Sequence, residues 1–422
     1  MTAITIAQGA TWAIAAFAAG GVIARPWKWP EAIWAVLGAA TLVALALVPW
    51  RDAVRAVSRG TDVYLFLTGM MLLAELARQQ GVFDWLAGIA TRQARGSAAR
   101  LFVLVFAVGA VVTVFLSNDA TAVVLTPAVY AAARAAQAEP LPYLFICAFV
   151  ANAASFVLPI SNPANLVVFD GHMPPLHAWL AQFGLPSILS IGTTYAMLRF
   201  LQRAALRGPI ARQVERPTLS PSGRLTLYGL GLAAAALLAA SAVGLDLGAP
   251  TALAGIVTAS IVLLYRRQPP WDLLKRISWS VLPLVAGLFV LVEGLVQTGV
   301  IRQLSQVLQA AAGSSIAATS WMAGAAAAIA CNLMNNLPVG LIAGSVVSAA
   351  PLPQEVRGAL MIGVDLGPNL SITGSLATIL WLIALRREGY EVSASEFLRL
   401  GAVVTGPALL LALLSPLLTH LR

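Results

Sequence analysis

The sequence predicts an all-α polytopic membrane protein built from two inverted repeats, each with five transmembrane helices, a re-entrant helical hairpin and a broken helix. Composition is the first reason: 59% of the residues are hydrophobic and 10% are charged, whereas soluble domains carry about 25% charged residues. The second reason is that the chain offers about ten apolar segments near the 20-residue length that a span needs. The third is that the two halves repeat each other, including the places where apolar segments are interrupted.

Two apolar segments between Val111 and Asp170 are interrupted by small polar residues and proline. The interruptions read SNDAT at 117–121 and PISNPAN at 159–165. In contact with lipid, such breaks would leave backbone polar groups without partners, at several kcal/mol each. They are tolerated where the broken backbone lines a cavity, and paired breaks in two halves are typical of a transporter site.

The second half carries the same features in the same order. CNLMNN occupies 331–336 and GVDLGPNLSITGS occupies 363–375, both within apolar runs. Further upstream, LFLTGMMLLAELARQQGVFDWL and PLVAGLFVLVEGLVQTGVIRQL align without a gap at an offset of 218, which pairs Gly69 with Gly287 and Glu75 with Glu293. We therefore divide the chain into repeats at 1–210 and 211–422.

The elements follow from the length and the interruptions of each apolar run. In the first half we expect spans near 4–24, 31–49 and 63–80, an amphipathic interfacial piece after 81, a hairpin at about 100–136, a broken helix at about 142–170 and a span at 177–203. In the second half the counterparts are spans at 223–244, 249–265 and 280–298, an interfacial piece, a hairpin at about 316–349, a broken helix at about 357–386 and a span at 396–419.

Charge gives the orientation of the two halves. Five crossings per half is an odd number, so the halves must be inverted relative to each other. If the Arg-rich link 204–224 is cytoplasmic, 20 of the 26 Lys and Arg residues fall on the cytoplasmic side, as the positive-inside rule requires. The loop 50–62, with three arginines outside, fits least well. Both termini are then periplasmic, and the expected location is a bacterial inner membrane.

The interruptions would gather short polar side chains at one midplane site. Broken helices point free N–H and C=O groups into such a site, and Asn, Ser and Thr add donors and acceptors. The candidate solute-binding residues are Ser117, Asn118, Thr121, Ser161, Asn162, Asn165, Asn335, Asn336, Asn369, Ser371 and Thr373. No Lys or Arg lies in 101–133, 143–198, 303–356 or 358–385, which disfavours a multiply charged anion and suits a neutral polyhydroxylated solute or a cation.

Four carboxylates are candidates for carrying protons, because ionisable residues inside membranes commonly form proton pathways. They are Asp119, Asp365, Glu75 and Glu293. Each candidate also has a structural interpretation: Asp119 could cap the returning arm of the hairpin, and Glu75 and Glu293 could form a shared structural hydrogen bond. The Asn side chains could serve only to satisfy the broken backbone. Cys147 and Cys331 are interpreted as small core residues, and no metal site or cofactor is expected.

Several motifs together resemble the arsenical pump membrane protein family, the ArsB-type arsenite and antimonite permeases of the ion transporter superfamily. They are FLSNDATAVVLTP at 115–127, LPISNPANL at 158–166, NNLPVG at 335–340 and GVDLGPNLSITGSLATILWL at 363–382. The resemblance implies an elevator-type ion transporter fold that exports the neutral trihydroxide of arsenite or antimonite in exchange for protons. Some members of this family pair with a soluble arsenite-stimulated ATPase. A partner of that kind and a homodimer are both left open for this chain.

Three other functions compete with this interpretation. A sodium-coupled carrier of carboxylate or sulfate anions, from the same superfamily, would share the hairpins, but the acidic residues and the missing basic ones count against it. A membrane enzyme is disfavoured because HExxH, GxSxG and GxxxxGK[ST] motifs are absent from the sequence. A channel fits paired breaks and inverted halves less well than alternating access does. The net charge of +9 is loop charge, so nucleic-acid binding is not expected.

Overall fold

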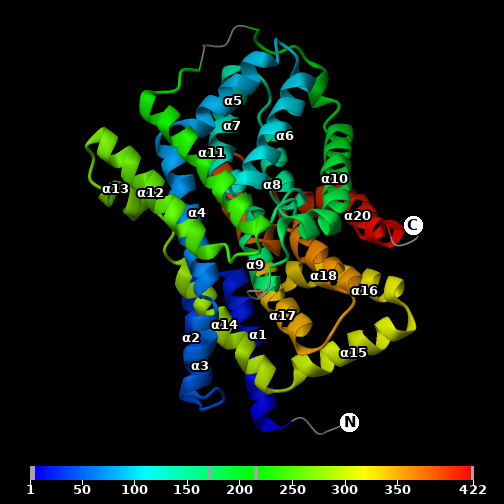
Figure 1. The fold of residues 1–422 in the computed structure, drawn as a ribbon. Coiled ribbons are helices and arrows are strands. Elements are labelled where there is room, and N and C mark those ends of the chain that lie inside the picture. The colour runs from blue at the N-terminus through cyan, green and yellow to red at the C-terminus, as the bar shows by residue number, and fades with distance from the viewer. Residues whose placement is uncertain (1–4, 170–172, 213–216, 420–422) are drawn as a thin grey trace.

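A computed structural model describes residues 5–169, 173–212 and 217–419, and within these ranges the regular structure is helical throughout (Figure 1). Six of the described helices are long and apolar enough to cross a membrane, and there are eight spans if each of two bent helix pairs counts as one. The prediction of an all-helical, multi-span membrane protein is therefore confirmed. In two of the expected spans the helices Glu31–Ala44 and Leu141–Ala153 are only 10–17 residues long, whereas Ala98–Phe115 and Ile316–Met334, expected as arms of the hairpins, are each long enough to cross.

The described residues of the first half form ten α-helices and a π-helical turn. They are α1 (Ile6–Ala24), α2 (Glu31–Ala44), α3 (Trp50–Arg59), α4 (Thr61–Gln79), α5 (Val82–Gln93), α6 (Ala98–Phe115), the π turn η2 (Ala120–Leu125), α7 (Thr126–Ala135), α8 (Leu141–Ala153), α9 (Pro163–Phe169) and α10 (Leu176–Leu201). Short 3-10 turns lie at Pro26–Lys28 (η1), Pro159–Ser161 (η3) and Ala205–Arg207 (η4).

The second half follows a similar order. It contains α11 (Pro221–Ala242), α12 (Gly248–Arg266), α13 (Trp271–Arg276), α14 (Val281–Gln297), α15 (Val300–Ser314), α16 (Ile316–Met334), α17 (Asn336–Ala349), α18 (Gln354–Leu366), α19 (Leu376–Arg387) and α20 (Ala394–Thr419). Two 3-10 turns, η5 (Gly367–Leu370) and η6 (Ile372–Gly374), separate α18 from α19. The division into inverted repeats stays a prediction, and residues 213–216 of the link between the halves lie outside the described ranges.

The segment 50–62, expected to be a loop, is instead mostly the helix α3. The preceding span ends early at Ala44, since Ala46 takes a positive φ of 54° and the chain turns there. Pro49 then stands at the N-cap of α3, a position that needs no backbone N–H. Asp52 lies in the first turn and forms an ion pair with Arg55, which places negative charge near the helix N-terminus where it is stabilising.

The third span of each half packs against a helix of the other half. Helix α4 of the first half packs against α12 of the second, while α14 of the second half packs against α2 of the first, and Figure 1 shows both pairs side by side. Glycines at the matched positions allow both crossings to be close. A Cβ at Gly69 would overlap the backbone of Thr251, and a Cβ at Gly287 would overlap the backbone of Ala35. The pairing of Gly69 with Gly287 in sequence therefore corresponds to a shared packing role.

We expect Gly69→Ala and Gly287→Ala to destabilise the protein, because backbone atoms of the facing helix cannot move aside as a flexible side chain can. Overpacking of this kind costs about 1–3 kcal/mol, more than the helix-propensity gain of about 1 kcal/mol from Gly to Ala. The measurement is the midpoint of thermal unfolding in detergent. Gly231→Ala in α11 is the matched control, since a Cβ there meets nothing within 4 Å. Unchanged midpoints in the two variants would contradict the close crossings.

Candidate functional site

The four interrupted segments meet around one small cavity. Its volume is about 20 Å³, room for about one water molecule. Every interruption contributes to its lining: Asn118 and Asp119, Asn162 and Pro163, Asn336 and Leu337, and Ser375, Leu376 and Ala377, together with Leu67 and Val281. None of these lining residues is basic. Segments more than 200 residues apart in sequence thus form one site, as the pattern of interruptions predicts.

The first interruption is shaped by its own side chains. Helix α6 ends at Phe115, with Leu116 as its C-cap, and the Ser117 hydroxyl then accepts a hydrogen bond from the Ala120 N–H at 3.1 Å. Asn118 accepts one from the Asp119 N–H at 2.9 Å. The side chain of Asp119 makes no hydrogen bond with other described residues and borders the cavity. Thr121 is directed away from it, with its hydroxyl 2.8 Å from that of Thr113.

At the second interruption, neighbouring asparagines take different roles. The amide of Asn165 donates to the carbonyls of Ser155, Leu158 and Pro159 at 3.0, 3.2 and 3.2 Å. It therefore satisfies backbone groups that the break leaves without helical partners. Ser161 also binds backbone, since its hydroxyl donates to the Val114 carbonyl at 3.0 Å.

Asn162 connects the cavity to a buried carboxylate. Its side-chain oxygen accepts from the Ala164 N–H at 3.0 Å, which caps α9, and its amide donates to Oδ1 of Asp365 at 2.7 Å. Asp365 is 0% exposed. Its other oxygen, Oδ2, has no hydrogen-bond partner among the described residues. The cavity thus has one carboxylate at its wall, Asp119, and one directly behind it.

The third interruption is a single residue between two helices. Asn335 separates α16 from α17 with a φ of +74° and a ψ of 155°, a backbone conformation that is nearly confined to glycine and is therefore strained here. Its side-chain oxygen accepts from the Leu337 N–H at 3.3 Å. Asn335 borders a separate small cavity that also contains Glu31. Asn336 faces the central cavity instead, and its side chain has no hydrogen bond to the rest of the described chain.

At the fourth interruption the predicted residues Asn369, Ser371 and Thr373 form hydrogen bonds to neighbouring helices. Asn369 donates to the Phe149 carbonyl at 2.8 Å and accepts from the amide of Asn152 at 2.9 Å. The hydroxyl of Ser371 donates to the side chain of Asn332 at 2.6 Å, and that of Thr373 donates to the Asn332 carbonyl at 3.1 Å. None of the three predicted residues borders the central cavity.

Sequence reasoning missed three residues at or near the site. Ser375 lines the cavity, whereas Asn152 and Asn332 anchor the fourth interruption. Asn332 stands within the CNLMNN motif and Asn152 is a lone amide in an otherwise apolar helix. A buried amide of this kind needs partners, so its position alone could have singled it out.

The two matched glutamates lie elsewhere and have similar surroundings. Glu75 accepts from Arg78 at 2.7 and 2.6 Å and from Gln79 at 2.8 Å. Glu293 forms an ion pair with Arg59 and accepts from Gln297 at 3.2 Å. Each glutamate is thus held by one arginine and by the glutamine four residues later. Neither borders the central cavity, which favours the structural interpretation of this pair.

We expect Asn165→Ala and Asn336→Ala to differ sharply in stability. Removing the Asn165 amide leaves buried carbonyls without a donor, at about 1–3 kcal/mol, whereas Asn336 gives up no hydrogen bond to the described protein. Chemical or thermal unfolding in detergent measures both variants against the unsubstituted protein. Equal losses of stability would show that the two asparagines share a structural role.

Comparison with known proteins places the chain among membrane transporters. The citrate transporter family model, CitMHS, matches residues 14–369. An uncharacterized transporter of Mycobacterium tuberculosis is 26% identical over 95% of this chain and 96% of that protein. The arsenical pump membrane protein of Escherichia coli K12 is 27% identical over 82% of this chain and 83% of that protein. The YdaH transporter of Alcanivorax borkumensis superposes with a TM-score of 0.55 at 15% identity, covering 91% and 96% of the two chains, and shares the fold.

Proposed function

The chain belongs to the CitMHS family of membrane transporters, and we propose that this member exports trivalent arsenite or antimonite, as the uncharged trihydroxide, in exchange for protons. The observation that carries the proposal is the cavity shared by the four interruptions. It combines amide and hydroxyl groups with a carboxylate, and its lining contains no Lys or Arg. The resemblance to proteins named arsenical pumps, over most of both chains, supports the same substrate.

The charge of the cavity lining favours a neutral solute over an anion as the substrate. The family description names citrate, which carries several negative charges and whose carboxylates are best bound by arginine or lysine. Here a carboxylate lies at the wall and another lies behind it, so a polyanion would be repelled and its desolvation would go uncompensated. A trihydroxide instead offers hydroxyl groups that both donate and accept, as amides do. Asn118, Asn162, Asn336 and Ser375 are the partners we propose for it.

Sulfur is not part of the proposed binding site. Trivalent arsenic is a soft centre that favours thiolate ligands, but neither cysteine borders the cavity. Both are buried, with the Cys147 thiol 3.9 Å from the carbonyl of Tyr143 and the Cys331 thiol 3.5 Å from that of Val364. Oxygen and nitrogen contacts would hold the solute weakly enough to release it, which a carrier requires.

The size of the cavity supports a carrier that must open. With a volume of about 20 Å³, it has room for about one water molecule, so a trihydroxide enters only if the helices around it separate. The cavity lies between α4 and α14, which are the third spans of the two halves, and the tips of the interrupted segments. Movement of the interrupted segments against the spans would open it, as in alternating access around a fixed site.

Coupling to protons follows from the absence of charge on the solute. A neutral solute gains nothing from the membrane potential, so uphill export needs a coupled charge. One proton moving inward through 100 mV supplies about 2.3 kcal/mol, enough for roughly fifty-fold accumulation. Asp119 and Asp365 are the proposed proton carriers, since one borders the cavity and the other contacts it through Asn162. Glu75 and Glu293 are less suited because arginines already neutralise them.

We further propose a bacterial inner-membrane location, with the 204–224 link cytoplasmic and both termini periplasmic. The chain brings no nucleotide-hydrolysis motif of its own, so the proton gradient is the proposed energy source. A soluble ATPase partner and a homodimer are compatible with this scheme, and neither is required by it.

The direct test of transport is arsenite uptake into inside-out vesicles with an imposed pH gradient, acid inside. We expect accumulation that collapses with a protonophore and survives the removal of sodium. Vesicles lacking the protein provide the baseline, and citrate is offered in parallel as the competing substrate. Sodium-dependent citrate uptake without arsenite uptake would overturn the proposed substrate in favour of an anion carrier.

Coupling is tested by Asp119→Asn and Asp365→Asn. At least one of them should abolish gradient-driven arsenite accumulation while preserving arsenite exchange at equal concentrations, because exchange needs the solute site but no net proton movement. Glu75→Gln and Glu293→Gln should keep gradient-driven transport. Asp84→Asn, on the exposed side of α5, is the acid-to-amide control. Uphill transport at the normal rate in both aspartate variants would place the proton carrier elsewhere.

A further inference from the structure

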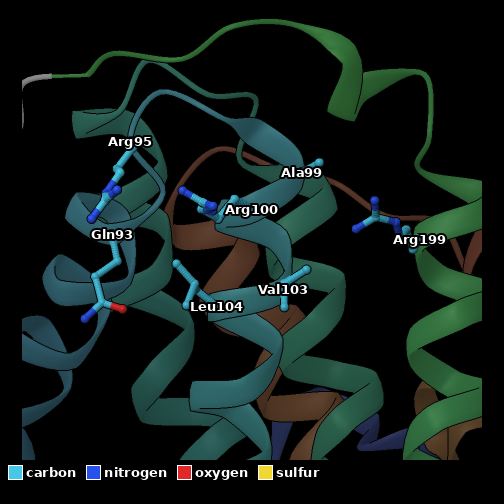
Figure 2. A pocket seen from close by; sticks show the side chains of 7 residues that line it. All are labelled: Gln93, Arg95, Ala99, Arg100, Val103, Leu104 and Arg199. Atoms are coloured by element: carbon cyan, nitrogen blue, oxygen red, sulfur yellow. The ribbon is translucent and has the colours of Figure 1, made fainter.

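A broad groove with a basic rim lies at the beginning of α6, far larger than the central cavity. Its volume is about 730 Å³. Three arginines border it: Arg95 beyond the end of α5, Arg100 in the first turn of α6, and Arg199 near the end of α10. Between them, Ala99, Val103 and Leu104 form an apolar wall (Figure 2). Figure 2 shows Arg100 and Arg199 on opposite sides of this wall.

The basic rim continues along the end of α10. An adjoining hollow of about 510 Å³ shares Ala99 and Arg199 with the groove and adds Arg203 and Arg207. None of these five arginines forms an ion pair with a carboxylate in the described part of the chain. Arg199 donates to the Tyr195 hydroxyl at 2.9 Å, and the guanidinium of Arg203 lies 4.3 Å from the centre of the Phe200 ring. The positive charge of the rim is therefore not neutralised by acidic side chains of the described protein.

An apolar surface leads away from the arginines along α6. The residues at four-residue spacing, Val103, Ala107, Val111 and Phe115, are all exposed, and this spacing places them on one face of the helix. Val103 is 40% exposed and Phe200, beside the adjoining hollow, is 55% exposed. Helix α6 is long and apolar enough to cross a membrane; in that position this face would meet acyl chains, and the arginines at its beginning would lie at the level of the lipid headgroups.

We propose that this groove is a binding site for an anionic phospholipid, with the phosphate between Arg100 and Arg199 and an acyl chain along the exposed face of α6. Basic pockets between spans at the membrane interface are suited to anionic headgroups. Arginine also binds phosphate in a bidentate manner that lysine cannot match. A free phosphate ion would use the arginines alone, whereas the apolar wall and the face beyond it fit a molecule with acyl chains.

The test is lipid binding to the delipidated protein in detergent, measured by native mass spectrometry with phosphatidylglycerol and with phosphatidylcholine of the same acyl chains. The unsubstituted protein should retain phosphatidylglycerol preferentially. The triple variant Arg95→Gln, Arg100→Gln and Arg199→Gln should lose about a hundredfold in its affinity for phosphatidylglycerol, given about fivefold per arginine near an anionic surface. The control is Arg302→Gln, Arg387→Gln and Arg399→Gln, which removes the same charge from exposed positions outside the groove. Equal retention by the two triple variants would overturn the proposal.

A second variant tests whether lipid binding depends on the shape of the groove as well as on its charge. Ala99→Phe leaves every arginine in place but fills the wall that the two hollows share, and it should also weaken phosphatidylglycerol binding. Inorganic phosphate should neither compete with the lipid nor raise the unfolding temperature at concentrations where phosphatidylglycerol does. Equal stabilisation by inorganic phosphate would assign the groove to a soluble anion. An unchanged lipid affinity in Ala99→Phe would show that the lipid binds elsewhere.

Discussion

Backbone groups freed by a helix break must find partners inside an apolar interior. An unmet carbonyl or N–H there costs several kcal/mol. Side-chain amides meet part of this demand: Asn165 donates to three carbonyls of its own break, Asn369 donates to the Phe149 carbonyl of α8, and Asn332 donates to the Gly367 carbonyl of the fourth interruption. With the breaks fixed in this way, the chain can bring several of them to one place without unfolding around them.

The candidate site consists of the polar side-chain groups that are not used to hydrogen-bond the broken backbone. Asn118 and Asn162 each use their oxygen for a local backbone N–H, which leaves the rest of the amide for the cavity or for Asp365, while Asn336 is uncommitted. The lining of the cavity has one carboxylate and no Lys or Arg, with Asp365 behind it, and this is why we propose a small neutral solute and a proton as its ligands. Arg59 and Arg78 lie outside the cavity, in the ion pairs of Glu293 and Glu75, and three other arginines border the groove beside α6.

The sequence predicted the helical membrane fold and the order of its interruptions, because lipid imposes apolar runs and makes each polar break conspicuous. It could not separate Asn162 from Asn165, three residues apart and identical in type, since only the tertiary fold decides which faces the cavity and which faces carbonyls. The role of Glu293 depends on the tertiary fold in the same way, because its partner Arg59 comes from the distant helix α3, whereas the partner of Glu75, Arg78, lies three residues along the same helix. That helix was itself expected as a loop, because its charge concealed an amphipathic pattern following Pro49.

We propose that solute and proton compete for one site, and the number of protons exchanged when arsenite binds to the purified protein tests this proposal. Calorimetric titrations in buffers of different ionisation enthalpy give this number without any membrane or gradient. We expect a net release of protons on binding that disappears when Asp119 and Asp365 are both replaced by asparagine. Arsenite binding without any proton exchange in the unsubstituted protein would contradict it.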